Sequence, residues 1–167
     1  MKKYELTEET VTVYGKTLYR IRAVRDFGSV KTGEFGGYIE KEENLSHFGD
    51  AWVYGNAKVY GNAKVSGDAR VSGNAWVYGN AWVYGNAEVF NTRHFFVQGP
   101  IGSRDGYVTF YRTKDDTVEV RCGCFSGSLQ EFVNQVEETH GGSRYEKEYK
   151  LAAELAKVCI RLEGESR

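Results

Sequence analysis

The sequence has few cysteines, few histidines and no long apolar run. Its cysteines are Cys122, Cys124 and Cys159, an odd number that favours reduced thiols in a cytosol over a disulfide framework. No apolar stretch is long enough to cross a membrane, and the first residues do not read as a signal peptide. The net charge of −1 argues against a protein that coats duplex DNA through bulk positive charge. We therefore expect a cytoplasmic protein without a membrane or duplex-DNA partner.

What the sequence does contain is a strict six-residue repeat. Valine recurs every six residues from Val53 to Val89, and alanine recurs with the same period from Ala51 to Ala87. Gly followed by Asn or Asp separates each Val from the next Ala. Because Gly, Asn and Asp tolerate left-handed backbone angles, this pattern predicts short strands joined by tight corners, with Val and Ala pointing inward.

The VxGNAx and VxGDAx units resemble the hexapeptide-repeat proteins, which form a left-handed parallel β-helix. The resemblance implies three hexads per coil and about three coils in total. Residues 36–53 are expected to supply an irregular first coil, with Ile39 and Leu45 in the alanine register. Because a short stack buries little core and needs caps at its ends, we expect self-association, as a homotrimer.

The flanking segments predict two further parts, so the chain divides into 1–34, 35–91 and 92–167. Residues 1–34 alternate apolar and polar side chains around a Tyr14-Gly15-Lys16 turn, which predicts a β-hairpin cap. Strands are predicted at 94–98, 106–113 and 117–124, and helices at 128–141 and 143–164. The predicted fold class is therefore mainly β: a short left-handed β-helix after a hairpin, followed by a small α+β domain.

Caps and apolar stripes define the two predicted helices. Ser128 and Glu131 have capping-box spacing, and Gly141 closes the first helix. The expected core stripes follow helical spacing. They are Phe132, Val133 and Val136 in the first helix, and Leu151, Leu155, Val158 and Leu162 in the second.

The second half of the chain carries a further resemblance. The stretches GPIGSRDGYVTFYRTKD and VRCGCFSGSLQEF, together with the GGYIEKEENLS lead, resemble small phage and prophage proteins of Gram-positive bacteria. The resemblance implies a mobile-element origin and a place in a bacterial host cytosol. It implies no activity.

Cations lie beside aromatic residues on the outward positions of the repeat. Stacking by 18 residues places Lys58 beside Trp76 and Tyr60 beside Tyr78, and on a second face it places Lys64 beside Trp82. Aromatic rings next to cations can sandwich a nucleobase and neutralise its phosphate. The alternative interpretation is an aromatic interface between subunits. Both interpretations hold if a ligand lies between subunits.

The C-terminal part offers weaker candidates. Gly102, Ser103 and Arg104 end a glycine-rich turn that suits phosphate oxygens, and Arg112 is a second candidate anion ligand. The alternative is a tight connection between strands with Arg104 paired to an acidic neighbour, and Arg112 is then a solvated strand residue. Cys122, Cys124 and Cys159 fall short of a zinc set even with His140 as a fourth ligand, so we expect buried thiols and no metal.

These candidates support three hypotheses of function. The first is a non-catalytic, cofactor-free binding protein that captures a small anionic, nucleotide-like ligand, such as a nucleotide signal of host defence. The second is a structural, trimerisation or host-protein interaction module. The third is an acyltransferase, because many hexapeptide-repeat enzymes use an interface histidine as a general base. The histidines here, His47, His94 and His140, all lie outside the regular hexads.

Overall fold

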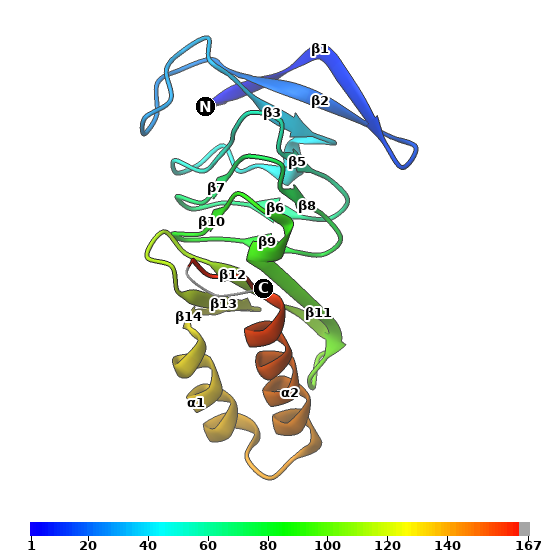
Figure 1. Cartoon of the computed structure of the whole chain (residues 1–167), viewed down its shortest axis with the longest axis vertical. Coiled ribbons are helices and arrows are strands. Elements are labelled where there is room, and N and C mark those ends of the chain that lie inside the picture. The colour runs from blue at the N-terminus through cyan, green and yellow to red at the C-terminus, as the bar shows by residue number, and fades with distance from the viewer. Residues whose placement is uncertain (164–167) are drawn as a thin grey trace. The chain divides into compact units, whose positions relative to one another are not determined.

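The computed structural model describes residues 1–163, in a chain that is mainly β with two α-helices (Figure 1). The chain divides into two compact units, Met1–Thr92 and Arg93–Arg167. Residue 164, the last of the predicted second helix, lies outside the described residues.

The first unit begins with the predicted β-hairpin. Strands β1 (Tyr4–Val13) and β2 (Lys16–Ala23) pair antiparallel around a two-residue turn. Its residues Tyr14 and Gly15 have φ of 48° and 78°. Two-residue hairpin turns with positive φ at both residues are favoured because their twist matches that of the flanking strands. Strand β2 also pairs with β3 (Phe35–Ile39). This joins the hairpin to a sheet of order β1-β2-β3-β5-β8, in which β5 is Lys58–Val59 and β8 is Trp76–Val77.

Two-residue strands follow, one per hexad, and pair in parallel with the hexad 18 residues further on. Lys58 lies beside Trp76, Trp52 beside Arg70, and Lys64 beside Trp82, each pair in a different sheet. Every valine and alanine of the repeat is at most 1% exposed, which confirms the predicted inward positions. The strands are β4 (Trp52–Val53), β5 (Lys58–Val59), β6 (Lys64–Val65), β7 (Arg70–Val71), β8 (Trp76–Val77), β9 (Trp82–Val83) and β10 (Glu88–Val89).

The register predicted for the lead segment was wrong. Ile39 pairs with Val59 and Leu45 with Val65, so both belong to the valine stack rather than the alanine register. The reason is that two extra residues separate Leu45 from Val53, in a loop that follows the short helix η1 (Glu42–Asn44).

Two residues of the N-terminal segment cover the first coil. The Tyr4 hydroxyl donates to the carbonyl of Leu45 at 2.8 Å, and the Lys3 ammonium donates to that of Ala51 at 2.6 Å. Both side chains are fully buried. The end of the stack is thus closed by the hairpin strand, as an exposed repeat end requires.

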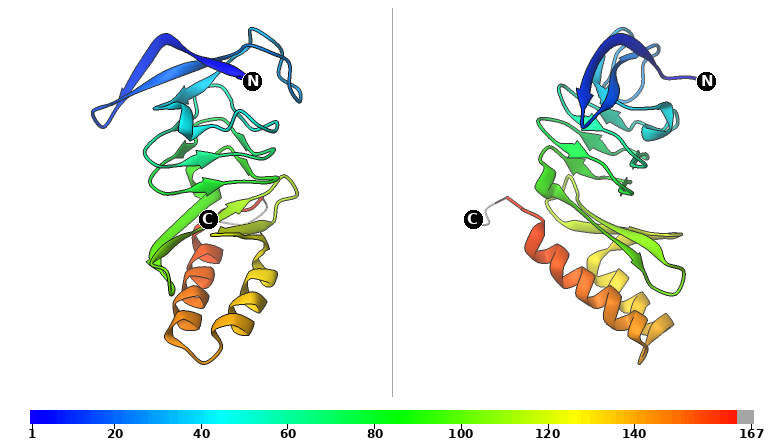
Figure 2. Two further views of the ribbon diagram at one scale, coloured as in Figure 1. Left: turned by 180° about the vertical axis from the view of Figure 1, so that it is seen from behind. Right: turned by 90° about the vertical axis from the view of Figure 1, so that its right-hand side faces the viewer.

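The second unit is a four-stranded antiparallel sheet with two helices on one face (Figure 2). Helix η2 (Thr92–His94) leads to the first of its strands. The sheet has one strand more than predicted, because residues 125–128 pair with β13 (Val118–Cys122) instead of running directly into the helix. Its elements are β11 (Phe95–Ile101), β12 (Gly106–Arg112), β13 (Val118–Cys122), β14 (Phe125–Ser128), α1 (Leu129–His140) and α2 (Arg144–Cys159).

The prediction for helix α1 is confirmed. The Glu131 amide donates to the Ser128 hydroxyl at 3.1 Å, and the Ser128 amide donates to the Glu131 carboxylate at 2.7 Å, which completes the capping box. Phe132 and Val136 are buried against the sheet, with Val133 partly buried beside them.

The apolar stripe predicted for helix α2 was wrong. Leu151, Leu155 and Val158 are 65%, 47% and 68% exposed. The buried face consists instead of alanines, with Ile160 just beyond the helix and Leu162 partly buried. Small side chains allow a helix to lie close to its neighbours, so the alanine face is the one that packs on the sheet and α1. The buried alanines are Ala152, Ala153 and Ala156.

Candidate functional site

The structure brings together the four residues predicted on the first face of the repeat. The ring centroids of Tyr60 and Tyr78 lie 5.4 Å apart in a stacked arrangement. The Lys58 ammonium lies 5.6 Å from the centroid of the Trp76 ring. Lys58 and Trp76 are half-buried, whereas Tyr78 is 45% exposed.

The N-terminal hairpin covers much of this face. Tyr60 is 7% exposed and packs in a cluster with Val13, Leu18 and Tyr38. Burial also raises the pKa of the Tyr60 hydroxyl. The Tyr14 ring meets Trp76 edge-on at 6.0 Å. Side chains of the protein itself therefore occupy the space in which a base would stack on Tyr60.

The candidates in the second unit do not form one anion site. The amide of Gly102 donates to the Glu148 carboxylate at 2.8 Å, while Ser103 and Arg104 are exposed. Arg112 is 3% exposed, and its guanidinium donates to Asp116 at 2.8 Å. Arg112 is the last residue of β12, whereas the turn with Gly102, Ser103 and Arg104 precedes the first residue of that strand. At the usual rise per strand residue, the two ends of β12 are about 20 Å apart. Two of the residues predicted to bind an anion, Gly102 and Arg112, thus already donate hydrogen bonds to carboxylates of the protein.

The expectation of buried thiols was wrong, because Cys122 and Cys159 are half-buried and Cys124 is exposed. Burial raises the pKa of Cys122, whose thiol contacts Tyr149. The His140 ring stacks on Tyr149 at 5.7 Å. Within residues 1–163, no three His, Cys, Asp or Glu side chains gather closely enough to hold a metal ion.

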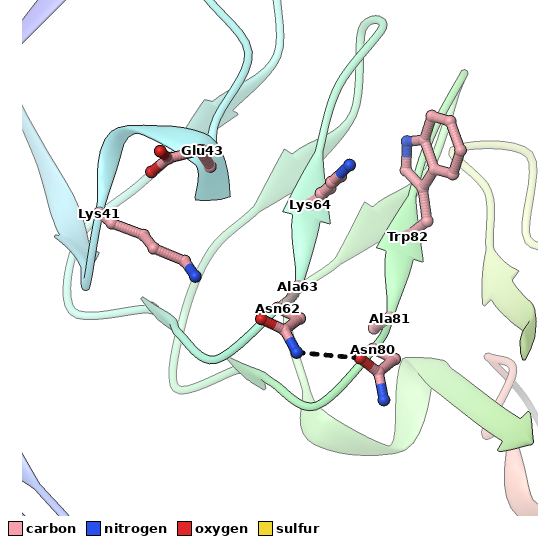
Figure 3. Close-up of a pocket in the computed structure, with 8 residues that line it drawn as sticks. All are labelled: Lys41, Glu43, Asn62, Ala63, Lys64, Asn80, Ala81 and Trp82. Atoms are coloured by element: carbon pink, nitrogen blue, oxygen red, sulfur yellow. Dashed lines mark hydrogen bonds between the residues drawn. The ribbon is translucent and has the colours of Figure 1, made fainter.

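A groove of about 490 Å³ lies on the second face of the repeat (Figure 3). Two stacked coils, at residues 62–64 and 80–82, line one side of it, and the segment after β3 with Lys41 and Glu43 lines another. Its lining residues are Lys41, Glu43, Asn62, Ala63, Lys64, Asn80, Ala81 and Trp82.

The repeat itself sets the polar groups of this groove. Asn62 and Asn80 occupy equivalent corners of successive coils, and the Asn62 amide donates to the Asn80 side-chain oxygen at 3.3 Å. Lys64 and Trp82 pair in register on β6 and β9, with the ammonium 5.7 Å from the ring centroid. The Trp82 indole N–H donates to the Ser66 hydroxyl at 2.8 Å, which fixes the ring.

Buried hydrogen bonds hold the wall that carries Lys41. The Asn44 side chain is fully buried; its amide donates to the carbonyl of Ala63 at 2.8 Å, and its oxygen accepts from the Lys41 amide at 2.9 Å. The Glu40 carboxylate accepts from the Gly61 amide at 2.7 Å, and this bond and Lys16 lower its pKa. The groove is therefore built on a fixed backbone.

Lys41, Glu43, Asn62 and Asn80 were missed as site residues by the sequence reasoning. The 18-residue stacking of the repeat contains the signal for Asn62 and Asn80, as it did for Lys64 and Trp82. The segment with Lys41 and Glu43 lies before the two extra residues of the lead coil, so hexad counting places it in the wrong register.

Neither a protein-family model nor a curated protein matches the chain. None of the helices described in residues 1–163 has the length and apolar character needed to cross a membrane.

Proposed function

We propose that this protein is a non-catalytic binding protein that captures a small anionic, nucleotide-like ligand in the groove between Lys41 and Trp82. The observation that carries the proposal is that two lysines, two asparagines and a tryptophan line one groove. Its volume lies in the usual range for small-ligand sites, about 300–1,000 Å³.

Each group in the groove has a part in this binding. Lys41 and Lys64 neutralise phosphate oxygens. The amides of Asn62 and Asn80 offer donors and acceptors to the edge of a base, and Trp82 offers an aromatic surface. Glu43 accepts from a hydroxyl or amino group of the ligand. Together these groups select a ligand that combines an anionic part with a planar polar part.

We also propose that the repeat is a left-handed parallel β-helix, which would hold the groups of the groove on a rigid frame. Three properties support this fold: the 18-residue parallel register, the distribution of the short strands over three sheets, and glycines with positive φ at the corners. Groups held on such a frame lose little conformational entropy on binding.

The proposal includes the setting of the molecule. We place it in the cytosol of a bacterial host, as a phage-derived homotrimer that sequesters a nucleotide signal of host defence. The resemblance of the GPIGSR and CGCFSG stretches to phage and prophage proteins supports this origin. Sedimentation analysis of the full chain tests the trimer, and a monomer at micromolar concentration contradicts it.

An interaction module is the second candidate function. Phe48, in the lead-coil loop, is 81% exposed, and exposed aromatic residues favour protein contacts. An acyltransferase finds less support. No histidine lines the groove, and the His47 ring is stacked on Tyr4 at 4.3 Å.

The test is a thermal-unfolding screen of the full chain against linear nucleotides, cyclic dinucleotides and acyl-coenzyme A thioesters. A ligand at about a hundred times its Kd stabilises by about 2.7 kcal/mol, which raises Tm by several degrees. Recovery of the nucleotide unchanged supports capture. An altered ligand, or a shift with a thioester, supports the enzyme instead. The absence of any shift rejects the proposal in favour of the interaction module.

A further inference from the structure

Helix α2 exposes large aliphatic residues and buries small ones. Leu151, Leu155 and Val158 are 65%, 47% and 68% exposed, and their spacing of four and three residues places them in one line along the helix. The opposite side buries Ala152, Ala153 and Ala156. The core of the second unit thus uses the smaller apolar face of this helix. A contiguous line of large aliphatic side chains at the surface is typical of an interaction site.

The exposed charges around this line are mostly positive, and one of the cations, Lys157, forms an ion pair with Glu154 at 2.8 Å. Besides the three aliphatic residues, five residues between 144 and 161 are exposed, of which four are basic and one is acidic. The whole chain, in contrast, has a net charge of −1. The five are Arg144, Lys147, Glu154, Lys157 and Arg161.

A hollow of about 400 Å³ adjoins the line at its N-terminal end. Leu151 lies in its wall together with two lysines and two glutamates, which are Lys147, Lys150, Glu146 and Glu154. The surface therefore combines an apolar line, a hollow of mixed charge at one end and a border in which exposed cations outnumber anions.

We propose that the exposed face of α2 binds an acidic amphipathic helix of a partner protein. The apolar side of the partner helix covers Leu151, Leu155 and Val158, and its carboxylates meet the basic border. Helix-on-helix recognition of this kind reads apolar anchors one turn apart, and complementary charges orient it. A second copy of the same face is a poor occupant because the excess of exposed cations on one copy would meet the same excess on the other. This binding is independent of the groove between Lys41 and Trp82.

The experiment uses the full chain and two labelled synthetic peptides that differ only in charge. One repeats Leu at helical spacing with Glu at the remaining positions, and the other has Lys in place of each Glu. Fluorescence anisotropy should show binding of the Glu peptide, at least about tenfold tighter than the Lys peptide. The variants Leu155→Ser and Lys147→Glu should each weaken that binding about tenfold. Raising the salt concentration to about 0.5 M should also weaken it, because salt screens the attraction between the charges.

Two controls separate this surface from general effects. Phe48→Ser removes an exposed apolar side chain of the first unit, and Lys64→Gln changes the groove. Both variants should leave peptide binding unchanged. Circular dichroism of Leu155→Ser shows that the helix is retained. Failure of the Glu peptide to bind, or equal binding of both peptides, contradicts the proposal. The proposal is also contradicted if the wild-type protein is a dimer and the Leu155→Ser variant is a monomer. In that case a second copy of the chain covers this face of α2. Binding to phosphatidylserine vesicles that requires Leu155, without binding of the Glu peptide, assigns the face to a lipid surface instead.

Discussion

The ammonium group of Lys64 lies 5.7 Å from the centroid of the Trp82 indole ring. One hexad earlier, Lys58 and Trp76 repeat this arrangement with a distance of 5.6 Å. The two pairs differ in what surrounds them. The Trp76 ring meets Tyr14 of the hairpin turn, whereas Lys64 and Trp82 line the groove. The repeat therefore contains a matched control for its own candidate site.

Lys64→Gln should weaken the binding of a nucleotide found in the thermal screen by about tenfold. The reason is that a charged hydrogen bond contributes about 1.5–3 kcal/mol. Lys58→Gln should change the Kd less than about twofold, because Lys58 is not among the described residues that line the groove. Isothermal titration calorimetry measures both values. The reverse order would move the ligand to the face of Tyr60 and Tyr78.

Asn44→Ala should lower the free energy of unfolding of the first unit by about 2–6 kcal/mol. The substitution leaves the Ala63 carbonyl and the Lys41 amide without their buried partner, at about 1–3 kcal/mol each. Asn56→Ala, at an exposed corner of the repeat, is the control and should cost less than about 1 kcal/mol. Urea unfolding followed by circular dichroism compares the two. Equal costs would mean that Asn44 does not anchor the wall of the groove.

Gly67→Ala should destabilise the repeat more than Gly79→Ala, although both residues have φ of +70°. The shared left-handed backbone costs about 1–2 kcal/mol for any residue with a side chain. In addition, a Cβ on Gly67 would lie 2.8 Å from the amide nitrogen of Gly85, whereas a Cβ on Gly79 meets no atom within 4 Å. Thermal unfolding should show the lower Tm for Gly67→Ala. Equal values would mean that neighbouring coils are not stacked closely at this corner.

The inward residues of the repeat could be predicted because a strict period leaves one consistent arrangement. Each hexad buries one Val and one Ala, so Lys64 and Trp82 follow as neighbours at the surface. Counting failed in the lead segment, where two extra residues shift Ile39 and Leu45 into the valine stack.

Helix α2 shows a second limit of the sequence. Both its alanine face and its leucine face are apolar, and periodicity does not tell which of them faces the sheet. The covering of Tyr60 by Val13 and Leu18 depends on contacts distant in sequence, which no local pattern encodes. These long-range contacts moved the candidate site from the first face of the repeat to the second.

Leu151→Ser should change the stability of the second unit by less than about 1 kcal/mol, because its side chain is 65% exposed. Ala156→Leu, in contrast, should cost about 1–3 kcal/mol, because residue 156 is fully buried and the added volume overpacks the core. Urea unfolding of both variants tests which face of α2 packs on the sheet. A larger loss for Leu151→Ser would place the leucine face in the core.

Stability of the second unit should fall between pH 6.5 and pH 4 through His94. Burial, reinforced by the nearby Arg112 guanidinium, lowers the pKa of His94 to about 4 from the usual 6.5. In this interval the unfolded chain binds a proton at His94 and the folded chain does not, so acidification favours unfolding. Above pH 6.5 both states are neutral at this residue and the full stability is present; below pH 4 both are protonated and the loss levels off. The slope approaches about 1.4 kcal/mol per pH unit for one proton.

His94→Gln removes this titration, so the unfolding free energy of the variant should depend less on pH between 6.5 and 5, where carboxylates contribute little. Parallel curves for the two proteins would show that His94 is already protonated in the folded state or that other groups set the acid limit.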